Sequence, residues 1–293
     1  MKRLLLAYNP VSGNALFKSR LDGIIEEFQK RDVLLSFYRT RKGNNDAMTD
    51  FIRASGAEGV IAAGGDGTLH GVVNLLMKTG IDLPVGMIGS GTSNDFATYL
   101  HVNENLEDYF DRIAKGQTRR VDLGRVGETY FVNVASAGVL TSIAHEVDAK
   151  LKNALGKLAY YLRGIGEIPK FRSFPLSLTA DGEETKLDAF LFIVLNSSVV
   201  GSMKNVAKDA VVDDGKLDFL AVKKCSPARL MKLTADLIAG KSVIGQEAVL
   251  HVQAKKFSVS VPDGSLVSDL DGELGPMLPL EIETIPNAIE VYC

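Results

Sequence analysis

The sequence has few of the features that mark disulfide-rich, metal-clustered, membrane-spanning or nucleic-acid-binding proteins. Its 293 residues include two cysteines, Cys225 and Cys293, and no Cys-x-x-Cys pair. A disulfide scaffold or a zinc site is therefore not expected, and a reducing cytoplasm is favoured. No apolar run approaches the ~18 residues of a membrane-spanning helix. The net charge of −3 also lacks the basic excess typical of nucleic-acid binding.

Two common nucleotide-binding motifs are absent as well. No Gly-x-x-x-x-Gly-Lys-Ser/Thr run occurs anywhere in the chain. A dinucleotide turn, Gly-x-Gly-x-x-Gly, begins at Gly65 but fails because His70 occupies the position of the last glycine. Any phosphate site must therefore be built differently.

A different glycine turn is present, and it is the most informative stretch of the chain. The apolar run 59–63 leads into Gly64-Gly65-Asp66-Gly67-Thr68, and a helical pattern follows at once. Main-chain N–H groups of such a turn and the positive end of the helix dipole both attract an anion. Asp66 suits a site where a metal, a ribose hydroxyl or a lysine compensates its charge. The alternative is a glycine-rich strand-to-helix turn that binds nothing.

The hydrophobic periodicity changes near residue 123. Before it, strands at 4–8, 33–38, 59–63 and 84–88 alternate with helical patterns, including 46–55, where Ala47, Phe51 and Ile52 are expected to face inward. After it, we expect many short strands, at 130–135, 176–179, 189–195, 217–222, 248–252, 257–261 and 280–285, and helices at 142–167 and 227–238. This predicts a three-layer α/β domain at 1–123 and a β-rich, sandwich-like domain at 124–284.

Polar turns follow each of the first four predicted strands, at 9–14, 40–45, 64–68 and 89–95. Because the carboxyl ends of strands in an open α/β sheet lie along one edge, these turns are expected to meet where ligands bind. Together they favour a phosphate or nucleotide site. For Asn94-Asp95, a plain helix N-cap is the alternative, and it is compatible with a ligand.

Two acidic groups lie in the second domain. One is Asp213-Asp214-Gly215 with Asp218, and the other is 269–273, which reads Asp-Leu-Asp-Gly-Glu. Acidic turns are usually solvated loops, since Asp and Gly are favoured turn residues. The functional alternative is that one turn holds Mg²⁺ through oxygen ligands and the other supplies a general base.

Taken together, these motifs resemble those of the diacylglycerol kinase catalytic family, and in particular its soluble bacterial lipid kinases. Sphingosine and ceramide kinases are relatives of that family. The resemblance covers nearly the whole chain, and its specificity comes from the order and spacing of short motifs. These are Asn9-Pro10-x-Ser12-Gly13, Gly64-Gly65-Asp66-Gly67-Thr68, Gly91-Thr92-x-Asn94-Asp95-Phe96-Ala97, Tyr130-Phe131-x-Asn133, Asp214-Gly215-x-Leu217-Asp218 and Asp271-Gly272-Glu273.

The resemblance implies ATP-dependent phosphorylation of a lipid hydroxyl, most simply that of diacylglycerol. It implies a nucleotide-binding first domain, to which about 285–293 return, and a catalytic cleft between the two domains. Asp214, with carbonyl oxygens near Val211 and Lys216, would hold a structural Mg²⁺. Asp271 would be the base, with Glu273 as second choice. The nucleotide contacts would be Asn9, Ser12, Thr40, Gly64, Gly65, Asp66, Gly67, Thr68 and Thr92.

The sequence departs from the family pattern at Gly71, where the family usually has Glu. His70 beside it is interpreted as a solvated or helix-packed side chain. Two alternatives to a lipid kinase stay open at this point. One is an NAD kinase-like or other small-molecule kinase, and the other is a catalytically weak regulator that binds nucleotide or lipid.

A lipid substrate requires transient membrane contact. The stretch 150–172 carries six basic residues against Glu167 alone, interleaved with apolar ones. A basic amphipathic helix can lie on an anionic leaflet, although a solvated helix is the alternative. We therefore expect a cytoplasmic protein that associates transiently with membranes. An exposed sheet edge could also support a homodimer.

Overall fold

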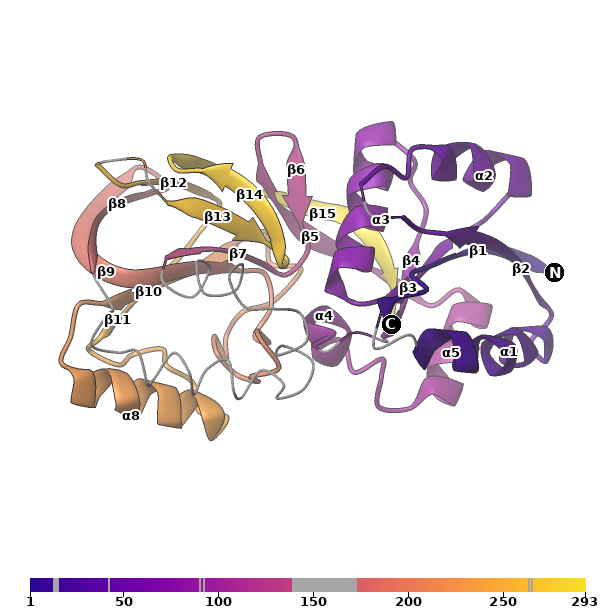
Figure 1. Ribbon diagram of the computed structural model, residues 1–293, viewed down its shortest axis with the longest axis horizontal. Coiled ribbons are helices and arrows are strands. Elements are labelled where there is room, and N and C mark those ends of the chain that lie inside the picture. Colours follow the sequence, from indigo (N-terminus) through magenta and orange to yellow (C-terminus); the bar gives the residue numbers. More distant parts are fainter. Residues whose placement is uncertain are drawn as a thin grey trace. The chain divides into compact units, whose positions relative to one another are not determined.

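The computed structural model describes residues 1–12, 16–41, 43–89, 91, 93–138, 173–262, 264 and 266–293. These residues divide into two compact units (Figure 1), Met1–Val121 with Asn287–Cys293, and Asp122–Pro286. The helix expected at 142–167 and the basic stretch 150–172 lie outside the described residues.

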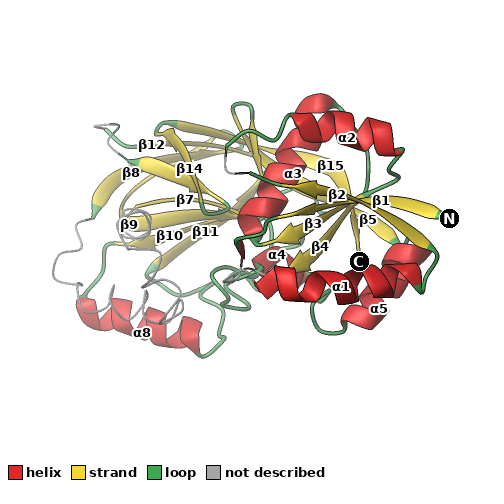
Figure 2. Cartoon of the chain, turned by 45° about the vertical axis from the view of Figure 1, so that its right-hand side comes forward, coloured by secondary structure: helices red, strands yellow, loops and turns green. Residues whose placement is uncertain are grey.

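The first unit is a parallel sheet covered by helices on both faces. Figure 2 shows α2 and α3 on one face and α1 and α5 on the other. The strand order is β2-β1-β3-β4, and Val291 of β15 (Leu280–Tyr292) pairs with Val85 of β4. The elements are β1 (Lys2–Tyr8), α1 (Leu16–Gln29), β2 (Val33–Arg39), α2 (Ala47–Ser55), β3 (Val60–Gly64), α3 (Asp66–Thr79), β4 (Val85–Gly89), α4 (Asp95–Tyr99) and α5 (Leu106–Lys115).

The buried strands explain why this unit was readable from sequence. Leu4, Leu5, Leu6 and Ala7 of β1 are all buried, as is the whole of β3. A parallel strand that is covered on both faces has no solvent side, so its sequence is a continuous apolar run rather than an alternation. The predicted three-layer α/β class is confirmed.

The strand order places a topological switch point between β1 and β3. Both strands pair in parallel, but β1 also pairs with β2 on one side, while β3 pairs with β4 on the other. Connections therefore leave the two strands in opposite directions, which opens a crevice at their carboxyl ends. The Asn9 N–H donates to Ala63 O at 2.9 Å, so the turns after β1 and β3 begin side by side.

Helix α2 faces the sheet with different residues from those predicted. Ile52 is buried as expected, but the inward placement of Ala47 and Phe51 was wrong, because Met48 and Thr49 are buried instead and both predicted residues are exposed. The ring of Phe51 packs edge-on against Tyr38 of β2, with 5.3 Å between centroids. Since β2 is the edge strand, the aromatic side chain covers the rim of the sheet rather than its face.

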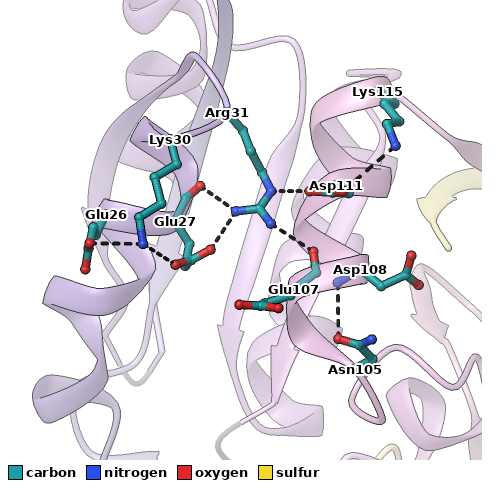
Figure 3. A network of polar contacts seen from close by, with 9 residues as sticks. All are labelled: Glu26, Glu27, Lys30, Arg31, Asn105, Glu107, Asp108, Asp111 and Lys115. Carbon is teal, nitrogen blue, oxygen red and sulfur yellow. Dashed lines mark hydrogen bonds and ion pairs between the residues drawn. The ribbon is translucent and has the colours of Figure 1, made fainter.

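On the opposite face, Arg31 joins the end of α1 to α5 (Figure 3). Its Nη1 donates to Glu27 O at 2.9 Å and to Glu27 Oε2 at 2.6 Å. Its Nε pairs with Asp111 Oδ1 at 2.5 Å, and its Nη2 donates to Glu107 O at 3.2 Å. A guanidinium with several fixed partners holds the two helices in one register.

The second unit is built from antiparallel strands. The long strand β9 pairs with β8 through its first half and with β10 and β7 through its second half. The rings of Phe192, Phe219 and Phe257 stack in the core with centroids 5.5 and 5.8 Å apart. The elements are β5 (Thr118–Val126), β6 (Thr129–Phe131), β7 (Val134–Gly138), β8 (Phe174–Ala180), β9 (Glu183–Leu195), β10 (Leu217–Lys223), α8 (Pro227–Ile238), β11 (Val249–Ala254), β12 (Lys256–Ser260), β13 (Val267–Leu270) and β14 (Glu273–Met277).

Two sequence-based expectations for this unit were wrong. The single strand predicted at 130–135 is divided into β6 and β7. The stretch 269–273, predicted as one acidic turn, instead ends β13 and begins β14, and only Asp271 and Gly272 lie between the strands. Helix α8, by contrast, has the predicted bounds, because Ser226 caps it and Pro227 begins it.

Candidate functional site

The glycine turn after β3 touches the turn after β4. A Cβ on Gly91 would lie 2.6 Å from the Cα of Gly65, and a Cβ on Gly64 would lie 2.2 Å from Thr68 Oγ1. Neither position has room for a side chain. Glycine is therefore required at Gly91 because two backbones meet, and at Gly64 because the Thr68 side chain lies against it, in addition to any approach by a ligand.

Asp66 holds these two turns together. Its Oδ2 accepts the N–H of Asn94 at 3.1 Å, and its Oδ1 accepts the N–H of Asp95 at 2.9 Å. From the sequence, a metal, a ribose hydroxyl or a lysine was expected to compensate the charge of the Asp66 carboxylate. The structure provides main-chain N–H groups at the start of α4, where a negative charge is stabilised.

Asn94 closes the turn after β4. It adopts a left-handed backbone with φ of 49°, its Oδ1 accepts the Gly91 N–H at 3.1 Å, and its Nδ2 donates to Gly91 O at 3.0 Å. Asn94 stands at the N-cap position of α4, as the alternative interpretation proposed, but its side chain forms no cap hydrogen bond. Thr92 lies outside the described residues.

The turns after β1 and β2 lie at the same end of the sheet. Asn9 Oδ1 accepts the Val11 N–H at 3.1 Å, which shapes the first turn. Ser12 Oγ would lie 3.6 Å from a Cβ on Gly65, so its hydroxyl is beside the glycine turn. The Thr40 hydroxyl donates to Tyr8 O at 3.2 Å, and this bond ties the second turn to the end of β1.

This arrangement suits an anion. Helix α3 begins at Asp66 behind the N-cap Gly65. The Thr68 and Leu69 N–H groups donate to Gly65 O at 2.9 and 3.2 Å, and the N–H groups before them have no preceding helical turn to accept them. The helix has 14 residues, and its dipole adds a partial positive charge at the same place. The first unit can therefore hold phosphate groups at the carboxyl ends of β1, β3 and β4.

In the second unit, the Asp271 carboxylate accepts three successive main-chain N–H groups. The partners are Val132 at 2.7 Å, Asn133 at 2.9 Å and Val134 at 3.0 Å. These bonds explain why the predicted strand 130–135 is broken, because the N–H groups turn toward the carboxylate instead of a neighbouring strand. Sequence reasoning missed this function of Asp271.

The three carboxylates around this turn have different surroundings. Asp271 and Gly272 have φ values of 54° and 91°, as the tight two-residue hairpin turns require. Asp269 is buried, and its Oδ1 accepts the Gly272 N–H at 2.7 Å. Glu273 is exposed as the first residue of β14. The Asp-Gly pair is a recognised hairpin signal, and it could have located β13 and β14 in advance.

The Asp214 turn offers oxygen ligands on an exposed surface. Asp214 Oδ1 accepts the Lys216 N–H at 2.9 Å, and its Oδ2 accepts Gln253 Nε2 at 3.0 Å. Val211 and Lys216 are exposed as well. Across the part of the chain that the structure describes, no three His, Cys, Asp or Glu side chains gather as metal ligands. A cation here would therefore combine one carboxylate with carbonyl oxygens and water, which suits Mg²⁺ rather than zinc.

Asp122, which was not predicted as a functional residue, forms hydrogen bonds to the main chain of that turn from the protein interior. Asp122 is fully buried, its N–H donates to Val212 O at 2.6 Å, and its Oδ2 accepts the Gly215 N–H at 2.6 Å. The available signal was a charged residue enclosed by Val121 and Leu123 in an apolar strand. A carboxylate buried in this way fixes the main chain of the turn.

The first unit has the geometry of a phosphate-binding α/β domain, and the second combines an antiparallel sheet with a buried acidic hairpin turn. Phosphoryl transfer needs groups of both kinds, because it depends on donors that stabilise phosphate charge and on a carboxylate that accepts the proton of the acceptor hydroxyl. None of the described helices is both long and apolar enough to cross a membrane.

Comparison with known proteins gives the family. Residues 3–126 match the diacylglycerol kinase catalytic domain, and residues 133–293 match the YegS C-terminal NAD kinase beta sandwich-like domain. A diacylglycerol kinase of Bacillus subtilis (strain 168) is 33% identical, covering 99% of this chain and 96% of the relative. One of Staphylococcus aureus (strain Newman) is 32% identical, covering 99% and 92%.

Solved structures agree with the sequence relatives. A diacylglycerol kinase from Bacillus anthracis str. Sterne aligns with a TM-score of 0.79 at 25% identity, over 99% of this chain and 96% of that chain. The chain therefore belongs to the diacylglycerol kinase family of lipid kinases. It is a kinase that phosphorylates a hydroxyl acceptor.

Proposed function

We propose that this kinase transfers the γ-phosphoryl group of ATP to the free hydroxyl of diacylglycerol, giving phosphatidic acid and ADP. The observation that carries the proposal is that relatives whose alignments cover 99% of this chain are named diacylglycerol kinases. The NAD kinase-like sandwich in the family description of residues 133–293 favours NAD as the second candidate acceptor.

The first unit is proposed to bind the nucleotide. Support comes from the glycine turn at the start of α3, its contact with the turn after β4, and the hydroxyl of Ser12 beside it. Main-chain N–H groups there would hold the phosphate oxygens and stabilise the charge that develops on them. The proposed nucleotide contacts are Asn9, Ser12, Thr40, Gly64, Gly65, Asp66, Gly67, Thr68 and Thr92.

The second unit is proposed to supply the base. The lipid hydroxyl gives its proton to a carboxylate while its oxygen attacks the γ-phosphorus, and the bond from that phosphorus to the bridging oxygen of ADP breaks. Asp271 is the first candidate, because three N–H groups hold its carboxylate in one orientation. Glu273 is the second candidate, because it is exposed two residues along.

We further propose a Mg²⁺ ion at the Asp214 turn. Asp214 and the carbonyl oxygens of Val211 and Lys216 would form an oxygen-only donor set, and the exposure of all three residues supports a hard, partly hydrated cation there. Such an ion would add positive charge and fix the loop that Asp122 supports from inside.

We propose that the protein is cytoplasmic and binds its lipid acceptor during transient contact with a membrane surface. The basic stretch 150–172, which motivated this expectation, lies outside the described residues. Sedimentation with vesicles of increasing anionic lipid content and increasing salt tests its contribution. The predicted homodimer is tested by light scattering on the full chain.

One experiment separates the candidate functions. The protein is incubated with γ-labelled ATP, Mg²⁺ and, in parallel, diacylglycerol, a sphingoid base, phosphatidylglycerol or NAD. Label in phosphatidic acid supports the proposal, label in another lipid redirects it, and label in NADP supports the second candidate. Binding of ATP with no transfer to any acceptor would indicate a regulator.

A further inference from the structure

The hairpin formed by β13 and β14 exposes three apolar side chains to solvent. Leu274 is 70% exposed, Met277 is 57% exposed and Val267 is 36% exposed. Val267 and Met277 are a cross-strand pair, and Leu274 pairs with Asp269 on the same two-stranded ribbon. In Figure 1, β13 and β14 lie next to each other, and β14 ends the strand order of the sheet. We call these three side chains the apolar ribbon.

The apolar ribbon is poorly suited to pairing with another strand. Pro276, the fourth of the five residues of β14, has no N–H to donate, and the register shifts between Val267 and Asp269. Proline and irregular pairing at a sheet edge prevent the edge from accepting a further strand. An occupant of this surface must therefore be held by apolar contact rather than by main-chain hydrogen bonds.

The area of the ribbon is too small for a stable protein interface. Three side chains exposed to this degree offer on the order of 300 Å² of apolar surface. A stable dimer buries about 800 Å² from each partner. A second copy of the chain therefore does not account for the exposure, whereas shallow insertion of a few side chains is sufficient for transient contact with a lipid surface.

Charge and position point to the same occupant. No Lys or Arg occurs between residues 266 and 279, so an interaction here depends on apolar burial and not on anionic headgroups. Leu274 directly follows Glu273, and the turn at Asp271 and Gly272 joins the two strands of the ribbon. A lipid drawn to the ribbon is thus brought to the strand that begins at the acidic turn.

We propose that the apolar ribbon of β13 and β14 inserts into the lipid surface from which the acceptor is taken. This inference rests on the proposed function, in which the acceptor is a membrane lipid. It assigns Val267, Leu274 and Met277 a membrane-docking function. It also predicts docking that anionic lipid does not strengthen, because the stretch 266–279 carries three acidic residues and no basic one.

The absence of tryptophan allows a direct test of insertion. The chain contains no Trp and eight Tyr, so Leu274→Trp introduces a single tryptophan at the ribbon, which can be excited selectively at the red edge of the absorption band. Its emission is expected to shift to shorter wavelength on addition of phosphatidylcholine vesicles that contain diacylglycerol, because the indole enters an apolar environment. The matched control is Phe51→Trp on α2, where the native side chain is 51% exposed, and its emission is expected to stay constant.

A second measurement tests what the ribbon does for catalysis. The double variant Leu274→Ser, Met277→Ser is compared with the native protein on vesicular diacylglycerol and on a dispersed short-chain diacylglycerol. We expect the ratio of vesicular to dispersed kcat/KM to fall at least about tenfold, from the apolar area removed. Co-sedimentation with neutral vesicles should fall in parallel.

The outcomes separate this inference from the proposed function. An unshifted emission of Leu274→Trp, an equal shift of Phe51→Trp, or an unchanged activity ratio would overturn membrane docking by the ribbon. Failure of the native protein to phosphorylate either form of diacylglycerol would overturn the proposed function instead. The fluorescence result stands in that case, since it does not depend on turnover.

Discussion

Replacing Gly91 by alanine tests whether contact between the two glycine turns builds the phosphate site. The added Cβ would lie 2.6 Å from the Cα of Gly65 and 3.0 Å from Asn94 Oδ1. Carbon atoms in ordinary contact are about 3.5–4.0 Å apart, so one backbone must move by roughly 1 Å. No rotamer change can relieve the clash, because the nearest neighbour is main chain.

The expected cost follows from this geometry. Overpacking of this kind costs about 1–3 kcal/mol. If the free protein relieves the strain by separating the turns, ATP binding must restore their contact against the same cost. At about 1.4 kcal/mol per factor of ten, the Kd for ATP should rise roughly 5- to 150-fold. Separating the turns would also lengthen the hydrogen bonds that the N–H groups of Asn94 and Asp95 donate to the Asp66 carboxylate.

The same substitution at Gly71 is a matched control. Gly71 is an exposed residue of α3 with nothing within 4 Å of an added Cβ. Alanine there should stabilise the protein by about 0.5–1 kcal/mol through helix propensity. Calorimetric ATP titration and thermal unfolding of both variants provide the assay. An ATP affinity of Gly91→Ala equal to that of Gly71→Ala would refute the claim that the two turns form one site.

Three further predictions concern other parts of the chain. Asp271→Asn should abolish phosphoryl transfer and retain ATP binding, and turnover by this variant would identify a different base. Arg31→Ala should lower the free energy of unfolding by about 2 kcal/mol, because it removes the bonds that join α1 to α5 (Figure 3), while Lys30→Ala, which removes only exposed ion pairs within the helix end, should change it far less. Arg125, and then Lys256, lower the pKa of Glu283 from its ordinary value of 4.5. This carboxylate therefore stabilises the fold above pH 4.5 and loses that contribution as the pH falls through its lowered pKa. In Glu283→Gln, the free energy of unfolding should fall less steeply with decreasing pH below pH 4.5. An unchanged pH dependence in that range would contradict the assignment.

The first unit was largely predictable because its signals are local. Buried parallel strands are continuous apolar runs, and the glycine cluster at 64–68 follows one of them directly. In the second unit, the helix bounds 227–238 were predicted for the same reason, because Ser226 and Pro227 begin the helix and the apolar period continues to its end. For such elements, the residues that decide the structure are neighbours in sequence.

The face of α2 and the division of the strand at 130–135 were not predictable in this way. Phe51 has a periodicity that fits burial, but β2 is an edge strand, and an aromatic ring at a sheet rim stays exposed. The residues at 130–135 have the alternation of one strand. Three main-chain N–H groups in this stretch nevertheless bind the carboxylate of Asp271, which lies 137 to 139 residues later in the sequence.

The sequence by itself determined the chemical groups available to this protein, namely the glycine turns, the acidic hairpin turn and the apolar residues that follow it. Only the tertiary structure decided the partners of those groups. Asp66 binds N–H groups 28 and 29 residues away, and Asp271 binds N–H groups 137 to 139 residues away. A hydrogen bond depends on distance and direction in space, and local periodicity contains no information about which distant main-chain segment will meet a given carboxylate.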